Sequence, residues 1–137
     1  MTTLDRSSEA RLKPVHPDLV RVIRRLAKDW TDPETGFVIT CGGRTVAEQK
    51  VMVAKGASTT MRSRHVIAPN GYAHAVDLAV TIHGKVKWDW PLYAKLSKAV
   101  KAAAAAEGVP VEWGGDWKTF KDGPHFQLPW AKYPGTK

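Results

Sequence analysis

Apolar residues recur at helical spacing in two long segments of the chain. In PDLVRVIRRLAKDW, residues 17–30, the apolar positions follow a helical period, and Pro17 suits the first turn of a helix. In PLYAKLSKAVKAAAAAEG, residues 91–108, apolar side chains share one face opposite the lysines: Leu92, Leu96, Ala99, Val100 and Ala103. A third helix is predicted for residues 45–56, because Thr45 and Glu48 match a capping box and Gly56 can end the helix.

Short apolar runs between these helices predict β-strands. The strongest are GFVITC at residues 36–41 and AVDLAVTI at residues 75–82. After the turn HGK, VKWDW at 86–90 predicts a short returning strand, and the last candidates are VPVEW at 109–113 and HFQL at 125–128. This order of elements indicates an α+β domain in which a small antiparallel β-sheet is backed by helices.

The length and composition of the chain narrow its class. Its 137 residues suffice for one domain, which would bury about two thirds of the surface of the unfolded chain. No apolar run approaches the roughly 20 residues of a membrane span. The N-terminal MTTLDRSSEARLKP lacks the apolar core of a secretory signal, so we expect a protein that folds in a cytoplasm. Cys41 is the only cysteine, which excludes an internal disulfide and a Cys-rich zinc site.

The chain is strongly basic, with a formal net charge of +8 and a pI near 9.8. Such a charge favours polyanionic partners: nucleic acid, anionic lipid or an anionic cell-wall polymer. The basic residues are dispersed over the predicted helices, however, where a solvated face explains them more simply than a nucleic-acid stripe. No aromatic and basic motif of an RNA-binding module is present, so we expect no nucleic-acid partner.

Three polar residues stand where chemistry is expected. Asp77 interrupts the apolar strand AVDLAV, so its carboxylate needs a metal or an ion-pair partner to offset its desolvation, and the two explanations are about equal. Considered alone, His125, between Pro124 and Phe126, is more simply explained as a core histidine. Asp122, three residues earlier, has the chemistry of a general base but also suits the turn KDGP.

Together these runs resemble a known signature. SRH at 63–65, AHAVD at 73–77 and DGPH at 122–125 are similar to Ser-x-His-x-x-Gly-x-Ala-x-Asp followed by Glu/Asp-x-x-His. This signature belongs to the zinc peptidases that include D-alanyl-D-alanine carboxypeptidases and dipeptidases and phage L-alanyl-D-glutamate endolysins. GGRTVAEQ at 42–49 and EWGGDW at 112–117 extend the resemblance over most of the chain. It implies a hedgehog/D-Ala-D-Ala-peptidase-like fold, with residues 1–137 as a single zinc peptidase catalytic domain.

The resemblance also implies roles for individual residues. His65, Asp77 and His125 match the ligands of one Zn²⁺ ion. Asp122 matches the catalytic carboxylate that accepts a proton from the attacking water, and Arg44 matches the arginine that binds substrate and stabilises the oxyanion. Three more residues are expected to support the ligands or to contact the substrate: Ser63, His74 and Trp113.

One departure from the signature affects the choice of ligand. Eleven residues separate His65 from Asp77, five more than in the signature, and we place the insertion around APNGY at residues 68–72. A rival assignment makes His74 the ligand in place of His65. Only two residues separate His74 from Asp77, and SRH is intact at 63–65, so the sequence favours His65 and leaves His74 at the rim of the site.

The function that the resemblance implies is hydrolysis of the L-alanyl-D-glutamate bond in the peptidoglycan stem peptide. Short loops and the glycine pair at 114–115 favour an open groove, which an endopeptidase needs. The alternatives are a D-alanyl-D-alanine carboxypeptidase or dipeptidase and a non-catalytic binding domain on the same scaffold, against which the intact Asp122 and Arg44 argue. We expect a monomer, attraction to the anionic cell envelope, and a place in the host cytoplasm until lysis, then at the cell wall.

Overall fold

The computed structural model describes residues 1–58 and 60–136, which form one α+β body with an antiparallel sheet. Its helices are α1 (Arg6–Leu12), α2 (Pro17–Asp29), α3 (Val46–Ala54) and α4 (Trp90–Glu107), with a 3-10 turn η1 (Gly114–Asp116). Its strands are β1 (Thr35–Cys41), β2 (Ala75–Ile82), β3 (Lys85–Lys87), β4 (Glu112–Trp113) and β5 (His125–Gln127). The predicted fold class is confirmed.

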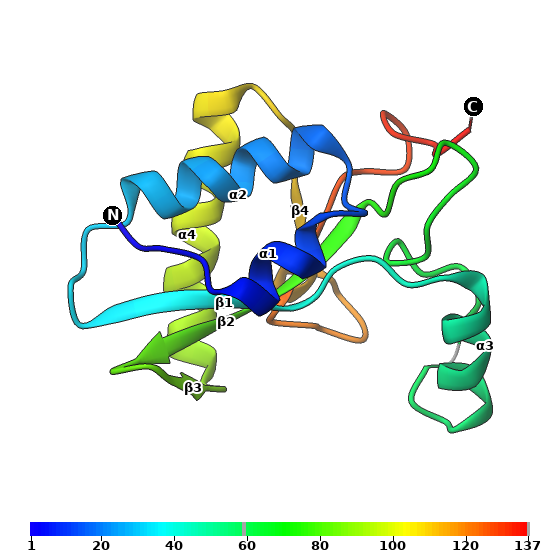
Figure 1. Cartoon of the computed structure of the whole chain (residues 1–137), viewed down its shortest axis with the longest axis horizontal. Helices are drawn as coiled ribbons and strands as arrows, with labels where there is room; N and C mark the ends of the chain where they lie inside the picture. The colour runs from blue at the N-terminus through cyan, green and yellow to red at the C-terminus, as the bar shows by residue number, and fades with distance from the viewer. Residues whose placement is uncertain (59, 137) are drawn as a thin grey trace.

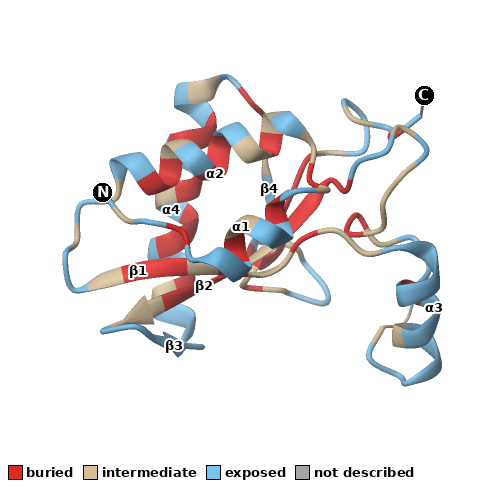
Figure 2. Ribbon diagram, in the orientation of Figure 1, coloured by how far each residue is buried: buried red, intermediate tan, exposed pale blue. Residues whose placement is uncertain are grey.

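The sheet has the order β1-β2-β5-β4, and β3 also pairs with β2. Helices α2 and α4 pack on each other and, through α4, on the sheet, while α1 lies along β1 (Figure 1). Helix α3 projects from one end of the body, and it is largely exposed, whereas the buried residues gather between α2, α4 and the sheet (Figure 2). None of the helices in the described part of the chain has the length and apolarity that a membrane span requires.

The core uses the apolar faces that the sequence predicts. Leu19, Ile23 and Leu26 of α2 meet Leu96 and Val100 of α4, and all five are at most 2% exposed. On β2 the core residues are Val76, Leu78 and Val80. Since side chains alternate along a strand, Asp77 points away from this core, to the opposite side of the sheet.

The predicted elements agree with the structure except at three places. The capping box of α3 is present, with Thr45 Oγ1 accepting from the Glu48 backbone N–H, and Gly56 follows the helix with a positive φ of 76°. Helix α1 was not predicted, because its sequence has no apolar repeat and Leu12 is its one buried apolar residue. The returning strand predicted for 86–90 is present but shorter: β3 pairs with β2 and ends at Lys87, because Pro91 lies in the first turn of α4 and helix geometry begins at Trp90. The strand predicted for 109–113 is reduced to Glu112–Trp113.

Candidate metal centre

The sheet register places Asp77 between two residues of neighbouring strands. On one side Asp77 lies opposite His125 of β5, and on the other it lies opposite Cys41 of β1. Directly opposed residues in antiparallel strands put their side chains on the same face. The pairing of β1 with β2 is irregular between Ile39 and Cys41, so that Thr40 is the extra residue of a bulge and Cys41 is turned to the side of Asp77.

His65 reaches the same place from the loop between α3 and β2. Its main chain runs beside Arg44: the Arg44 N–H donates to the His65 carbonyl at 2.7 Å, and the Ile67 N–H donates to the Arg44 carbonyl at 2.8 Å. The His74 N–H donates to the Arg64 carbonyl at 2.8 Å, which closes the loop that holds the inserted residues. Two backbone segments therefore fix the position of His65, although it lies outside the sheet strands.

Three donor atoms converge at this point. His65 Nε2 lies 3.2 Å and His125 Nδ1 lies 3.1 Å from the same carboxylate oxygen, Asp77 Oδ1. A tetrahedral Zn²⁺ ion with bonds of about 2.0–2.1 Å holds its ligand atoms about 3.3 Å apart. The distance of each imidazole nitrogen from Asp77 Oδ1, and the nitrogen and oxygen chemistry, are therefore those expected of zinc ligands.

The second nitrogen of each imidazole ring is held by an acceptor. His65 Nδ1 lies 2.8 Å from the Gly42 carbonyl, and His125 Nε2 lies 2.7 Å from Gln127 Oε1. An N–H at each of these positions leaves His65 Nε2 and His125 Nδ1 as free lone pairs toward Asp77, the arrangement that orients histidine ligands in metal sites. Neither Gly42 nor Gln127 was predicted from the sequence, although Gln127 stands two residues after His125, on the same face of β5.

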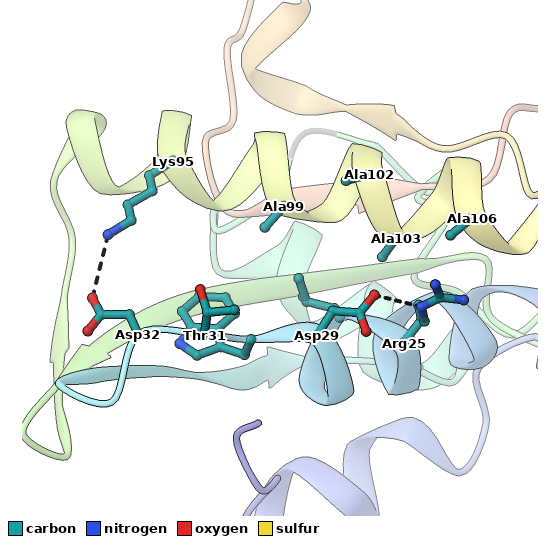
Figure 3. Close-up of a pocket in the computed structure, with 11 residues that line it drawn as sticks. Arg25, Asp29, Thr31, Asp32, Lys95, Ala99, Ala102, Ala103 and Ala106 are labelled. Carbon is teal, nitrogen blue, oxygen red and sulfur yellow. Dashed lines mark hydrogen bonds and ion pairs between the residues drawn. The ribbon is translucent and has the colours of Figure 1, made fainter.

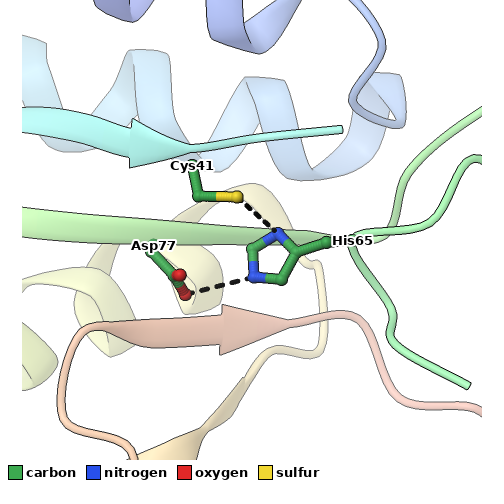
Figure 4. A group of neighbouring side chains, drawn as sticks. All are labelled: Cys41, His65 and Asp77. Atoms are coloured by element: carbon green, nitrogen blue, oxygen red, sulfur yellow. Dashed lines mark hydrogen bonds and ion pairs between the residues drawn. The ribbon is translucent and has the colours of Figure 1, made fainter. Parts of the chain in front are cut away.

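Cys41 also lies close to this group, and with His65 and Asp77 it forms another set of potential metal ligands (Figure 4). The thiol sulfur is 3.6 Å from His65 Nδ1, whereas Asp77 faces the opposite nitrogen, Nε2. Because one ion cannot bind both nitrogens of a ring, Cys41 and Asp77 cannot both join His65 on one ion in this arrangement. The other set of donor atoms that lie within 4.8 Å of one another, from Asp77, Asp122 and His125, has no such conflict.

The close approach of these groups shifts their pKa values. Burial alone would raise the pKa of Asp77, but hydrogen bonds from His125 and His65 outweigh it and hold this pKa well below its usual range. Burial alone would lower the pKa of His65, but the hydrogen bond and charge of Asp77, with a contribution from Cys41, raise it to about 10. Without a metal, the group is therefore an imidazolium paired with a carboxylate.

Asp122 lies beside the three donors, with a carboxylate oxygen within 4.8 Å of ligand atoms of Asp77 and His125. Burial, then the negative charge of Asp77, raises the pKa of its carboxyl above the ordinary value. The Asp122 N–H donates to the Gly114 carbonyl at 3.1 Å, and the Trp113 indole N–H donates to the Gly123 carbonyl at 2.7 Å. The β4–η1 segment thus fixes the loop that carries Asp122.

The glycine pair 114–115 serves this packing. A Cβ at Gly114 would lie 2.4 Å from the Asp122 carbonyl oxygen, and a Cβ at Gly115 would lie 2.2 Å from the Trp113 ring. Both glycines are buried. The interpretation that they open a groove is therefore wrong: they permit close contacts under the Asp122 loop.

Arg44 lies at the other side of the centre, held by two side chains. Its Nη1 donates to Gln49 Oε1 at 2.9 Å, and its Nη2 lies 3.3 Å from Cys41 Sγ. Gln49 is fully buried and donates in turn to Ser58 Oγ and to the Thr60 carbonyl. The guanidinium is therefore fixed toward the centre by a network around the buried Gln49, which was not predicted from the sequence.

Of the three remaining predicted residues, Ser63 and Trp113 lie at or beside the centre, and His74 does not. Ser63 lines the groove at the centre, and its Oγ accepts from the His65 N–H at 3.2 Å. Trp113 supports the Asp122 loop. His74 is not at the rim: it is 1% exposed, and its Nε2 accepts from the Asn70 amide at 3.1 Å on the side of the molecule near His16.

The groove at the centre has a volume of about 440 Å³ and is lined by Arg44, Asp122 and His125, among others. A second groove, of about 370 Å³, lies between α2 and α4 over alanines of α4 (Figure 3). Its charged residues are engaged in ion pairs along the rim, Arg25 with Asp29 and Lys95 with Asp32, and do not converge on a point. Reaction chemistry is therefore expected at the first groove.

Comparison with known proteins agrees with this geometry. The family model of phage L-alanyl-D-glutamate peptidases matches residues 1–128. The chain is 40% identical over 117 residues to the L-alanyl-D-glutamate peptidase of Listeria phage A118, which is 85% of this chain and 39% of the relative. It is 30% identical over 99 residues to the peptidoglycan L-alanyl-D-glutamate endopeptidase CwlK of Bacillus subtilis, 66% of this chain and 59% of that one. The chain thus spans about two fifths and three fifths of these curated relatives.

A solved structure supports the same relationship. The crystal structure of the Serratia marcescens L-Ala D-Glu endopeptidase ChiX superposes with a TM-score of 0.81 at 46% identity. The match covers 96% of this chain and 94% of that one, so the two folds correspond nearly throughout. The resemblance inferred from the SRH, AHAVD and DGPH motifs is confirmed, and the chain belongs to the family of phage L-alanyl-D-glutamate peptidases.

Proposed function

We propose that this protein is a zinc peptidase that hydrolyses the L-alanyl-D-glutamate bond of the peptidoglycan stem peptide. The observation that carries the proposal is the convergence of His65 Nε2 and His125 Nδ1 on Asp77 Oδ1, with the outer ring nitrogens held by Gly42 and Gln127. The names of the Listeria phage, Bacillus and Serratia relatives support the choice of bond.

In this proposal the ion is Zn²⁺, held by His65, Asp77 and His125. When bound, it supplies Lewis acidity to water and to the scissile carbonyl. Asp122 takes a proton from the attacking water and returns it to the departing amine, and its raised pKa suits a group that must hold a proton between these steps. Arg44 donates hydrogen bonds to the carbonyl oxygen as negative charge develops on it.

We further propose that residues 1–137 act as one catalytic domain and as a monomer. One cluster of buried apolar side chains joins α1, α2, α4 and the sheet, which supports a single domain. The place of action is the bacterial cell wall, reached from the cytoplasm of an infected host at lysis, and the relative from a Listeria phage supports this interpretation. The net charge of +8 would favour approach to the anionic envelope.

Digestion of purified cross-linked peptidoglycan, followed by mass spectrometry, tests the bond. We expect glycan strands that retain L-alanine, and free peptides that begin with D-glutamate. Release of D-alanine or its dimer, with whole stems left on the strands, would identify a carboxypeptidase or dipeptidase instead. Binding without any cleavage, in zinc-loaded protein, would identify a non-catalytic domain on the same scaffold.

A further inference from the structure

Two side chains of the groove have no part in the proposed mechanism. Arg62 and Trp130 both line the groove that contains His65, Asp77 and His125. Both are exposed, and the Arg62 guanidinium carbon lies 4.8 Å from the centre of the Trp130 ring. A cationic group and an aromatic ring in contact at this distance attract each other, and the ring restricts the orientations of the planar guanidinium.

A neighbouring arginine shows what holds the ring. Arg64 is 4% exposed, and its guanidinium carbon lies 4.1 Å from the centre of the Trp130 ring. It donates to the Leu128 carbonyl at 3.0 Å and to the Tyr133 carbonyl at 2.6 Å, on either side of Trp130 along the chain. Arg64 therefore fixes the segment that carries the ring, and its Nε and Nη2 groups donate to main-chain carbonyls.

Arg62 differs from Arg64 in this respect. Its main chain is fixed, because the Arg62 N–H donates to Thr60 Oγ1 at 2.9 Å. Its guanidinium forms no hydrogen bond or ion pair with any residue that the structure describes, apart from its contact with the ring. Arg44 uses part of its N–H donors on Gln49 and Cys41 and keeps others for its proposed role, whereas no described residue accepts a hydrogen bond from the Arg62 guanidinium. Such a group suits a carboxylate, which the planar guanidinium binds through two parallel N–H donors.

The substrate of the proposed function carries a carboxylate close to the reaction. A glutamate residue inside a peptide uses one of its two carboxyl groups for the chain, and the other stays free. In an L-alanyl-D-glutamate bond this free carboxylate belongs to the residue on the amine side of the cleaved bond. It must therefore lie within one residue of the metal centre when the bond is cut.

We propose that Arg62, oriented by Trp130, binds this free carboxylate and selects an acidic residue on the amine side of the cleaved bond. The inference rests on the proposed peptidase function and adds a specificity site to it. Arg62 precedes the ligand His65 by three residues, so the same short loop supplies both the metal centre and the recognition of the residue to be released.

A pair of substrates that differ in one charge tests the inference. The probes are N-acetyl-L-alanyl-γ-D-glutamyl-L-lysine with a free α-carboxylate and the same peptide with an α-carboxamide. The wild-type protein should cleave the acid with a higher kcat/KM than the amide. Arg62→Gln should lower kcat/KM for the acid by about 10- to 100-fold, the range expected for loss of hydrogen bonds to a charged group, and should change that for the amide by less than about 3-fold.

Matched variants separate this effect from folding and from general attraction. Arg6→Gln removes an exposed arginine from α1, outside the groove, and should leave both rates unchanged. Trp130→Leu should also reduce the preference for the acid, because the guanidinium loses the ring that orients it. Equal losses on acid and amide in Arg62→Gln, or a wild-type protein that cleaves both alike, would overturn the inference while leaving the peptidase function intact. If wild-type protein cleaves neither probe nor cross-linked wall, the proposed function itself is wrong.

Discussion

At the scale of single residues, the centre depends on one carboxylate oxygen that two imidazole rings share. In the metal-free protein Asp77 holds His65 in its charged form, because the raised pKa of His65, about 10, lies above neutral pH. A histidine must be neutral to bind a metal, so uptake of the proposed zinc ion at neutral pH would displace a proton from this ring. The contacts of His65 and His125 with Asp77 also fix the positions of the proposed ligand atoms.

The choice between His65 and His74 is tested by metal content. His65→Ala removes a nitrogen that lies 3.2 Å from Asp77 Oδ1, and we expect protein purified without added zinc to lose its near-equimolar metal. His74→Ala should keep the metal, since His74 contacts Asn70 and His16 instead. Metal analysis by mass spectrometry checks both variants. Loss of metal from His74→Ala alone would require a different ligand set.

The role of Asp122 is tested by an isosteric change. Asp122→Asn preserves the shape of the side chain but cannot accept a proton from water. We expect the variant to fold and to bind zinc, and to lose about 10²- to 10⁴-fold in kcat, the usual contribution of a general acid or base. Circular dichroism and metal analysis serve as controls. A variant that retains more than about a tenth of the wild-type rate would remove Asp122 from this role.

At the scale of elements, the sheet register brings together residues that are far apart in the sequence. Asp77 and His125 are opposed across β2 and β5, and the bulge in β1 adds Cys41. The sequence predicted the strands themselves, because their apolar runs are plain. It predicted neither the register nor the bulge, because both depend on pairing between distant segments.

Among the helices, too, some were predicted from the sequence and one was not. The boundaries of α2 and α4 agree with their predicted ranges within one residue at each end, since each carries a regular apolar face and a proline in its first turn, and Gly108 ends α4. Helix α1 lacked that signal: it is seven residues long, and the Asp5 carboxylate, which accepts from the Ser8 N–H, caps it.

The sequence motifs identified His65, Asp77, His125 and Asp122 as a set. The role of the Gly42 carbonyl could not be predicted, because a backbone group carries no sequence signal.

A substitution of Gly114 tests whether the β4–η1 segment supports the loop that carries Asp122. Gly114→Ala places a methyl group 2.4 Å from the Asp122 carbonyl oxygen, so the loop must move. We expect a loss of about 1–3 kcal/mol in the free energy of unfolding and a lower kcat, because Asp122 shifts from the centre. Gly36→Ala is the matched control, since its Cβ would meet only the hydroxyl oxygens of Thr2 and Thr81. Urea denaturation and peptide hydrolysis measure both effects. Full activity in Gly114→Ala would contradict the supporting role of this segment.

At the scale of the whole molecule, the basic residues of α2 and α4 lie on exposed faces, as the sequence predicts. The arginines of α2 also pair with carboxylates there: Arg24 with Glu9, and Arg25 with Asp29 and Glu107. The lysines of α4 are exposed, although Lys95 and Lys101 also meet carboxylates, Asp32 and Asp116. These exposed pairs contribute little to stability one by one, and they weaken further with salt. The excess charge on the groove side includes Arg62 and Arg44, which face the proposed substrate.

The stability of the molecule should depend on pH through His74. Burial, together with the charges of Arg64 and His16, lowers the pKa of His74 to about 4, whereas an unfolded chain titrates near the ordinary value of 6.5. Between these two values the unfolded chain binds a proton that the folded chain excludes, so the free energy of unfolding falls as the pH falls. By pH 5 the titration of this one residue lowers the free energy of unfolding by about 2 kcal/mol relative to pH 7.5.

His74→Gln keeps an acceptor for Asn70 and removes the titration. Urea denaturation of both proteins at the two pH values should therefore show a smaller acid-induced loss in the variant, by about that amount. Taking the difference between variant and wild type cancels metal release and every other titration that they share. Equal losses in the two proteins would mean that His74 accepts a proton without unfolding the chain.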